Sequence, residues 1–123
     1  MTSDAFKAWL DAYKRAWETR DPGAAEVLFS EQAVYLETPF GDPMRGRETI
    51  RAYWEHVPRT QDDVHFHYEV LAVAGEAGIA HWWASFVRVP SGKRVHLDGI
   101  AAVTFDGDGK CQRFREWWHK RDG

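Results

Sequence analysis

The sequence is poor in cysteine and has no long apolar run. Among its 123 residues there is a single cysteine, Cys111, so no internal disulfide can form. A lone cysteine is typical of a reducing compartment, and we expect a cytoplasmic protein. No apolar stretch approaches the roughly 18 residues of a membrane span, and the N-terminal segment lacks the basic-then-apolar order of a signal peptide. Membrane-spanning and disulfide-rich secreted proteins are therefore disfavoured.

An excess of positive charge is also missing. The formal net charge is −3, without a cationic run, so we expect no binding to nucleic acid or to an anionic membrane. What the sequence has in abundance is aromatic side chains: seven Trp, seven Phe and four Tyr. A core of this size does not need so much ring area. We interpret part of it as the wall of a pocket for a small molecule.

Two spacing patterns divide the chain. In the first half, apolar residues recur at helical spacing around a short strand and a turn-rich segment at 38–46. In the second half they alternate, and glycine-rich turns separate the alternating runs, as in a meander of hairpins. The predicted helices cover 6–17, 22–29 and 47–57, and the predicted strands cover 33–37, 64–74, 79–89, 94–105 and 110–120. Pro58 marks the end of the third helix.

Helices followed by an antiparallel sheet indicate an α+β fold. A single sheet of such long strands must curl and cover one face with the helices. We therefore predict one domain over residues 1–123, in which a curved antiparallel sheet wraps around about three helices to form a cone with an internal pocket.

Three segments carry a resemblance to a known family. They are DPGAAEVLFSEQAVY at 21–35, PMRGRETIRAYW at 43–54 and DGIAAVTFDGDGK at 98–110, and an aromatic strand follows them. Together they resemble the nuclear transport factor 2-like superfamily, with its SnoaL-like and ketosteroid-isomerase-like branches most similar. The resemblance covers nearly the whole chain and implies the cone-shaped fold. The superfamily includes isomerases, cyclases, dehydratases, epoxide hydrolases and binders without catalysis, so the fold does not fix the reaction.

Ketosteroid isomerase uses a carboxylate base, a Tyr and a protonated Asp that together hold an oxyanion. The resemblance implies that Tyr13 takes the place of the Tyr and Glu37 that of the base. The position of the protonated Asp is filled by Ala101. Since losing one oxyanion donor commonly costs on the order of a hundredfold in rate, steroid isomerisation itself is disfavoured.

The last predicted strand contains a further carboxylate, Glu116. Aligned with the family, its alternation directs Phe114, Glu116 and Trp118 into the pocket and Arg113 to the outer face. Glu116 then shares a proton with Glu37, or it has a structural role in an ion pair or as a cap. The predicted pocket wall consists of Trp17, Phe29, Phe40, Tyr53, Trp54, Ala101, Phe114 and Trp118.

Two other polar residues join the pocket only under particular strand geometries. Asp98 faces it if the adjacent Gly99 marks a bulge. His81 faces it in one register of the strand at 79–89, whereas the slightly favoured register places Trp82 there instead.

The remaining reactive side chains do not suggest a site of their own. The histidines, including His65, His67 and His96, show no spacing with cysteines or carboxylates that supports a metal site, so no metal or cofactor is expected. Cys111 has no base at strand spacing, which disfavours a thiol nucleophile.

These observations predict a cofactor-independent acid/base enzyme, namely an isomerase, cyclase, dehydratase or hydrolase acting on a small apolar cyclic or carbonyl compound. Glu37, Tyr13 and Glu116 are its candidate catalytic residues. The alternative is a small-ligand-binding protein without catalysis. A homodimer through the outer face of the sheet is also expected, because Trp117 and other strand aromatics need cover there.

Overall fold

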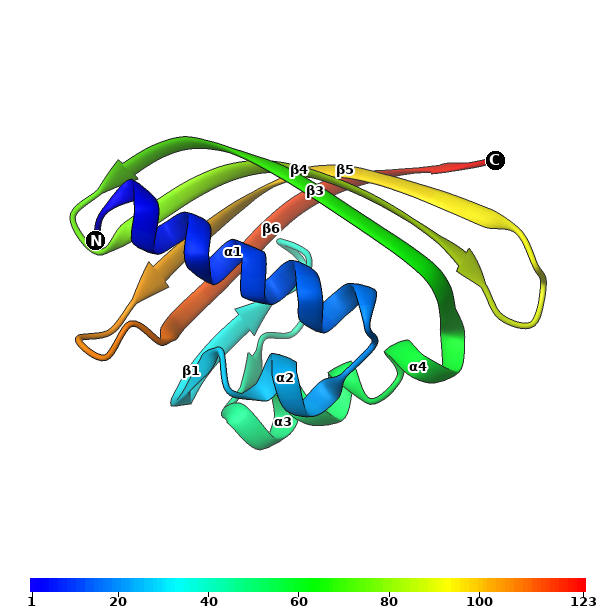
Figure 1. The fold of residues 1–123 in the computed structure, drawn as a ribbon. Helices are drawn as coiled ribbons and strands as arrows, with labels where there is room; N and C mark the ends of the chain where they lie inside the picture. Colours follow the sequence, from blue (N-terminus) through cyan, green and yellow to red (C-terminus); the bar gives the residue numbers. More distant parts are fainter.

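A computed structural model describes all residues 1–123 as a curved sheet with helices on one face (Figure 1). The elements follow the order α1 (Ser3–Glu18), α2 (Pro22–Glu26), β1 (Phe29–Leu36), β2 (Met44–Arg45), α3 (Arg47–Trp54), α4 (Val57–Thr60), β3 (Gln61–Ala74), β4 (Ala77–Arg88), β5 (Arg94–Phe105) and β6 (Cys111–Asp122). The predicted α+β cone is confirmed. None of the helices is long and apolar enough to cross a membrane.

Local sequence explains where the first helices begin. The Thr2 hydroxyl accepts the backbone N–H of Ala5 at 3.0 Å and caps α1. The Asp21 carboxylate caps α2 by accepting the N–H of Ala24 at 3.2 Å, and Pro22 occupies the first helical position, where no N–H is needed. The apolar stripe of α1 is buried along its whole length.

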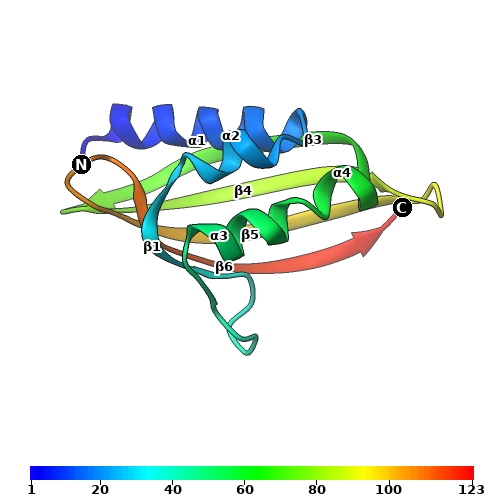
Figure 2. The same cartoon turned by 90° about the horizontal axis from the view of Figure 1, so that it is seen from below.

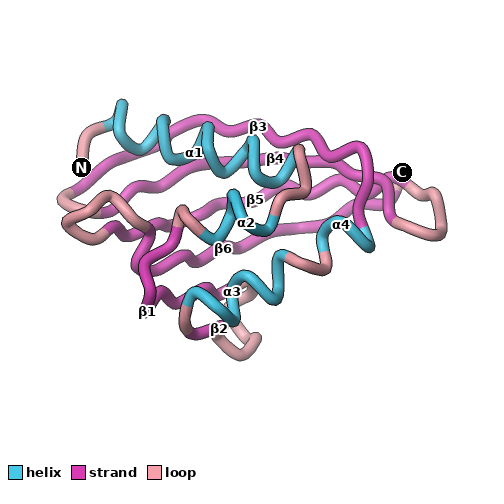
Figure 3. The backbone as a smooth tube through the Cα atoms, turned by 60° about the horizontal axis from the view of Figure 1, so that its bottom comes forward, coloured by secondary structure: helices cyan, strands magenta, loops and turns pink.

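The six strands form one sheet in the order β2-β1-β6-β5-β4-β3. Hairpins join β3 to β6 into an antiparallel meander, whereas β1 lies parallel to β6. The sheet arches over α1, and α2, α3 and α4 lie on the same concave side (Figures 1 and 3). The core and any internal cavity therefore lie between this face and the helices.

The structure differs from the sequence prediction in the bounds of several elements. Helix α2 ends at Glu26 rather than at 29, α3 ends at Trp54 rather than at 57, and β3 begins at Gln61 rather than at 64. Strand β1 begins at Phe29 rather than at 33, and the turn-rich segment contains the two-residue strand β2. Pro58 does not terminate the helical region. It lies in the first turn of α4, a position that tolerates proline because its N–H would have no helical partner. The parallel pairing of β1 with β6 could not be predicted, because residues distant in the chain make it.

The register of β4 follows the favoured alternative. Trp82, Ala84 and Phe86 are buried on the concave face, whereas Trp83 is 38% exposed on the outer face. The pairing of β4 with β5 is regular from Ala77 to Val87, without a shift that would reverse the alternation. The register that would place His81 in the pocket is therefore wrong.

Candidate functional site

A cavity of about 190 Å³ opens between the concave face of the sheet and helices α1, α3 and α4. Most of its walls are aromatic or aliphatic, and two carboxylates lie among them. Its lining residues are Tyr13, Trp17, Tyr35, Glu37, Tyr53, Trp54, Val57, Gln61, Trp82, Phe86, Arg88, Leu97, Glu116, Trp118 and Lys120.

Glu116 is the only ionisable carboxylate, and the only polar or charged residue, that is buried, with 7% of its surface exposed. It lies on the inward face of β6, directly opposite Ala101 of β5. No protein group forms a hydrogen bond or an ion pair with its carboxyl group. Burial, and then the negative charge of Glu37, raise the pKa of Glu116 well above its ordinary value. The carboxyl group therefore holds its proton well above the usual acid range.

Glu37 follows the last residue of β1 and lies at the same cavity. Because β1 runs parallel to β6, with Leu36 beside Arg115, the end of β1 is brought next to Glu116. The indole N–H of Trp118 donates to the Glu37 carbonyl at 2.9 Å and ties the two strands together here. Glu37 is partly exposed, whereas Glu116 is buried.

Three tyrosines surround the two carboxylates. The hydroxyl groups of Tyr13 and Tyr35 lie 3.3 Å apart and share a hydrogen bond. Burial, and then the negative charge of Glu116, raise the pKa of both phenols. Burial and then the charge of Glu37 do the same for Tyr53. The phenols therefore remain protonated and can act as hydrogen-bond donors toward a ligand.

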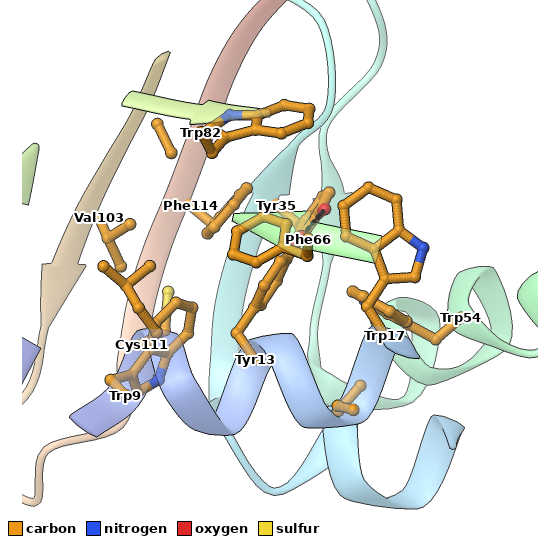
Figure 4. Close-up of a cluster of buried hydrophobic side chains, with 14 of the residues drawn as sticks. Trp9, Tyr13, Trp17, Tyr35, Trp54, Phe66, Trp82, Val103, Cys111 and Phe114 are labelled. Atoms are coloured by element: carbon orange, nitrogen blue, oxygen red, sulfur yellow. Dashed lines mark hydrogen bonds between the residues drawn. The ribbon is translucent and has the colours of Figure 1, made fainter. Parts of the chain in front are cut away.

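Stacked rings hold the tyrosines in place. The rings of Tyr35 and Phe114 are 4.7 Å apart and nearly parallel, and Tyr13 stacks on the same Phe114 at 5.5 Å. Figure 4 shows Tyr13, Tyr35 and Phe114 together between α1 and the sheet, with Trp82 across from them. Such a packed aromatic cluster leaves little freedom for the hydroxyl groups to move.

Two indole groups at the cavity are without partners. The N–H groups of Trp54 and Trp82 are buried and make no hydrogen bond. Buried donors are nearly always paired in folded proteins, so these two are exceptions, and neither nitrogen has appreciable surface open to the cavity. By contrast, the Trp17 indole donates to the Gln61 side chain at 2.7 Å.

The structure brings most of the sequence-predicted site residues together. Glu37, Tyr13 and Glu116 line the cavity, as do Trp17, Tyr53, Trp54 and Trp118. Ala101 and Phe114 line a very small void of about 10 Å³ that Glu116 and Tyr13 also border. Phe29 is fully buried but packs in the core against Trp9 and Tyr35 rather than at the cavity.

The prediction that Phe40 lines the pocket wall is wrong. It is 101% exposed, because the segment between β1 and β2 projects away from the body of the protein (Figure 2). Two prolines and a glycine at 39–43 favour such a turn, and the sequence has no signal that fixes its direction.

Asp98 and His81 do not reach the cavity either. They lie on the outer face, where the His81 ring bonds Asp98 at 3.0 Å and Glu69 at 3.1 Å. Gly99 marks no bulge, since β5 pairs regularly with both neighbours around it. A Cβ there would lie 2.5 Å from the Trp117 carbonyl and 2.8 Å from the Trp118 Cβ. The glycine therefore makes room for the neighbouring strand.

Several lining residues escaped the sequence analysis, chiefly Tyr35, Gln61, Arg88, Leu97 and Lys120. Tyr35 could have been found, because it lies two residues before Glu37 on the same predicted strand. Arg88 and Lys120 fall at strand ends, where an exposed cation is unremarkable in a sequence.

Other candidate centres are weaker. No three His, Cys, Asp or Glu side chains lie together where they could hold a metal ion. Cys111 is fully buried, and burial raises the pKa of its thiol, which opposes nucleophilic use. A larger hollow of about 480 Å³ on the outer face is lined by His67, Trp83, His96 and their neighbours. It contains no buried carboxylate, so we place the candidate site in the inward cavity.

Comparison with known proteins agrees with the fold. No curated protein matches the chain. A structure described as the epoxide hydrolase/cyclase-like enzyme SalBIII, with a role in pyran ring formation in the polyether salinomycin, superposes with a TM-score of 0.81. It is 21% identical, over 92% of this chain and 89% of that one.

Two further structures are similar. A presumed isomerase from Bacillus subtilis has a TM-score of 0.84 and 18% identity, over 94% of this chain and 87% of that one. A protein with a ketosteroid isomerase-like fold from Catenulispora acidiphila, in complex with trimethylamine, has a TM-score of 0.78 and 17% identity, over 89% and 83%. The model of the SnoaL-like domain matches residues 9–114, and the chain therefore belongs to the SnoaL-like family.

Proposed function

We propose that the protein is an enzyme that performs acid/base catalysis on a small, mostly apolar molecule with its own side chains. Glu37 acts as the base and Glu116 as the acid. Tyr13, with Tyr35 behind it, donates a hydrogen bond to the reacting oxygen. In one turnover Glu37 takes a proton from a carbon or hydroxyl group of the substrate or from water, and Glu116 gives its proton to an oxygen. The proton then returns from Glu37 to Glu116.

The observation that carries this proposal is the state of Glu116. It is buried and unpaired, burial raises its pKa well above the ordinary value, and it lies at a cavity that also holds Glu37. Two carboxyl groups in such different environments are suited to opposite roles, one as acid and the other as base. A structural carboxylate would instead be ion-paired or capping a backbone group.

Glu116 also offers a substitute for a group that the sequence lacks. The family position of the protonated Asp is occupied by Ala101, and Glu116 is the direct partner of Ala101 on the next strand. The neutral carboxyl group of Glu116 can thus donate a hydrogen bond into the same region of the cavity, from β6 instead of β5.

Cavity size limits the substrate. An apolar cavity of about 150 Å³ is large enough for benzene, and the cavity here measures about 190 Å³. The buried part of the substrate is therefore about one ring in size, which argues against a four-ring steroid. A monocyclic carbonyl compound or a small epoxide fits. The similar structures described as cyclase-like or as an isomerase support reactions of this class.

Substitution of the base tests the proposal. The protein is assayed on monocyclic enones for deuterium uptake from D₂O, and on monocyclic epoxides for ring opening, both by mass spectrometry. We expect Glu37→Gln to lower the rate by about 10²–10⁴-fold, the usual contribution of a positioned base. Glu55→Gln is the matched control, because Glu55 is exposed and outside the cavity. A Glu37→Gln variant as active as the wild type on a turned-over substrate would refute the role of Glu37.

A binding protein without catalysis is the second candidate, favoured by the mostly aromatic and aliphatic lining of the cavity. Carboxyl ¹³C NMR separates the two. Titration of Glu116 near or above neutral pH supports catalysis, whereas acid-range titration supports binding alone.

The homodimer and the cytoplasmic location remain predictions. The dimer is supported by the outer face of the sheet, where Ile79, Trp83 and Trp117 are each 38–41% exposed. Such a row of apolar side chains is commonly covered by a partner. Sedimentation equilibrium of the wild type and of Trp83→Glu tests it: a monomer in both cases would reject the dimer.

A further inference from the structure

The two ends of the cavity differ in charge. At the deep end lies Glu116, and at the solvent end lie Arg88 and Lys120. Glu116, Trp118 and Lys120 are alternate residues of β6. Four residues of strand span about 13 Å, so the cation and the acid lie at opposite ends of the cavity.

Arg88 is held at the mouth by packing. It is the last residue of β4, and its guanidinium carbon lies 5.4 Å from the centroid of the Phe86 ring. Phe86 is itself a lining residue, so this cation–π contact keeps the guanidinium at the rim. No carboxylate forms an ion pair with it, and its charge is available to a ligand.

Lys120 is only loosely engaged. Its ammonium group lies 3.9 Å from the Asp122 carboxylate, and both side chains are exposed. An exposed pair at that distance contributes little, and a ligand anion can replace Asp122 at small cost. Lys120 and Arg88 lie on strands separated only by β5, on the same side of the sheet. Through Leu97, Lys120 is level with Ala84, four residues or about 13 Å before Arg88, so the two long side chains border the mouth from different sides.

The stretch between the two ends is apolar. Trp82, Leu97 and Trp118 line it from the sheet, and Trp17 lines it from α1. A ligand that matches this sequence of surfaces has an oxygen at its buried end, an apolar middle and a negative charge at its outer end. An anion at the mouth also stays away from Glu37, whose negative charge would repel it in the interior.

We infer that the natural substrate carries an anionic group, a carboxylate in the simplest case, that Arg88 and Lys120 bind at the mouth while its apolar body enters the cavity. The position of the reacting oxygen beside Glu116 rests on the proposed function. The recognition of the anion rests only on the charges at the mouth and on the apolar walls.

Three probes of similar shape and different charge test this inference: 3-phenylpropanoate, its neutral amide and 3-phenylpropylammonium. Affinities are measured by quenching of tryptophan fluorescence, since four tryptophans line the cavity. We expect the wild type to bind the carboxylate about tenfold more tightly than the amide at low salt. The preference should shrink as salt is added.

Variants assign the preference to the mouth. Arg88→Gln combined with Lys120→Gln should bring the carboxylate down to the affinity of the amide and leave the amide unchanged. The control removes the same charge elsewhere, with Arg15→Gln and Arg113→Gln, two exposed arginines outside the cavity and without ion-pair partners. This control should keep the wild-type preference.

The outcomes also separate this inference from the acid/base proposal. Equal affinity for carboxylate and amide in the wild type, or a preference that survives in the Arg88/Lys120 variant, overturns the anion site and leaves the catalytic proposal standing. Tighter binding of the ammonium probe overturns it in favour of a cation among the aromatic walls. If Glu37→Gln still binds the carboxylate more tightly than the amide, the anion site is supported. This holds whether the variant has lost its enzymatic activity or kept it. Binding of none of the probes overturns the anion site.

Discussion

Glu116 has an effect on stability whose sign can be worked out from its position. The carboxyl group is buried, and burial followed by the charge of Glu37 raises its pKa in the folded protein. In the unfolded chain the pKa returns to its ordinary value of about 4.3. Between the two pKa values the folded protein binds more protons than the unfolded one, so stability falls as pH rises through this window. Glu116→Gln removes this loss.

The magnitude follows from linkage. Every unit by which the folded pKa exceeds the unfolded one lowers the free energy of unfolding by about 1.4 kcal/mol at pH values above the folded pKa. For a chain of this length that corresponds to a change in Tm of about 5 °C. We therefore expect Glu116→Gln and the wild type to melt at similar temperatures near pH 4, and the variant to become the more stable protein toward pH 9.

Thermal unfolding followed by circular dichroism from pH 4 to pH 9 measures this difference. Glu55→Gln is the control, because it makes the same chemical change on an exposed side chain, and its melting curve should follow the wild type at every pH. Parallel curves for Glu116→Gln and wild type would refute the reasoning, as would a variant that loses stability with rising pH. We expect Glu116→Gln to be more stable but less active than the wild type, because burying an acid in an apolar cavity serves catalysis and lowers stability.

Two predictions concern packing and exposure. Gly78→Ala should lower the free energy of unfolding by about 1–3 kcal/mol in denaturant titrations, because its Cβ would lie 2.5 Å from the buried Phe6 ring; an unchanged midpoint would contradict this packing. Phe40→Ser should change stability by less than about 0.5 kcal/mol and leave probe affinities unaltered, since the ring is fully exposed. A loss of affinity in that variant would show that the ring contacts ligand after all.

Much of the fold could be read from spacing. The stripe of α1 and the alternation of β3 to β6 depend on neighbours in the chain, and such patterns survive in any tertiary context. Placing Glu116 inward required the family resemblance as well as the period of two. The alternation alone leaves open which of the two faces is the concave one.

What the sequence could not supply depends on distant partners. The pairing of β1 with β6 joins segments about 80 residues apart, and nothing local in either strand specifies it. The outward course of the loop with Phe40 and the role of Gly99 as space for Trp118 likewise depend on backbone contacts that no pattern records. A binding role for Arg88 can be inferred only from the structure, which places the end of its strand at the cavity mouth.

The parallel contact between β1 and β6 has a consequence for the order of folding. It is the pairing that brings Glu37 beside Glu116, and β6 is the last strand of the sheet to leave the ribosome. A nascent chain can complete α1 and the hairpins of β3 to β5 while its two carboxylates are still on separate, unpaired segments. The site therefore cannot form before β6 has been synthesised, and a truncation ahead of Glu116 would remove it while leaving the helices and the hairpins of β3 to β5 encoded.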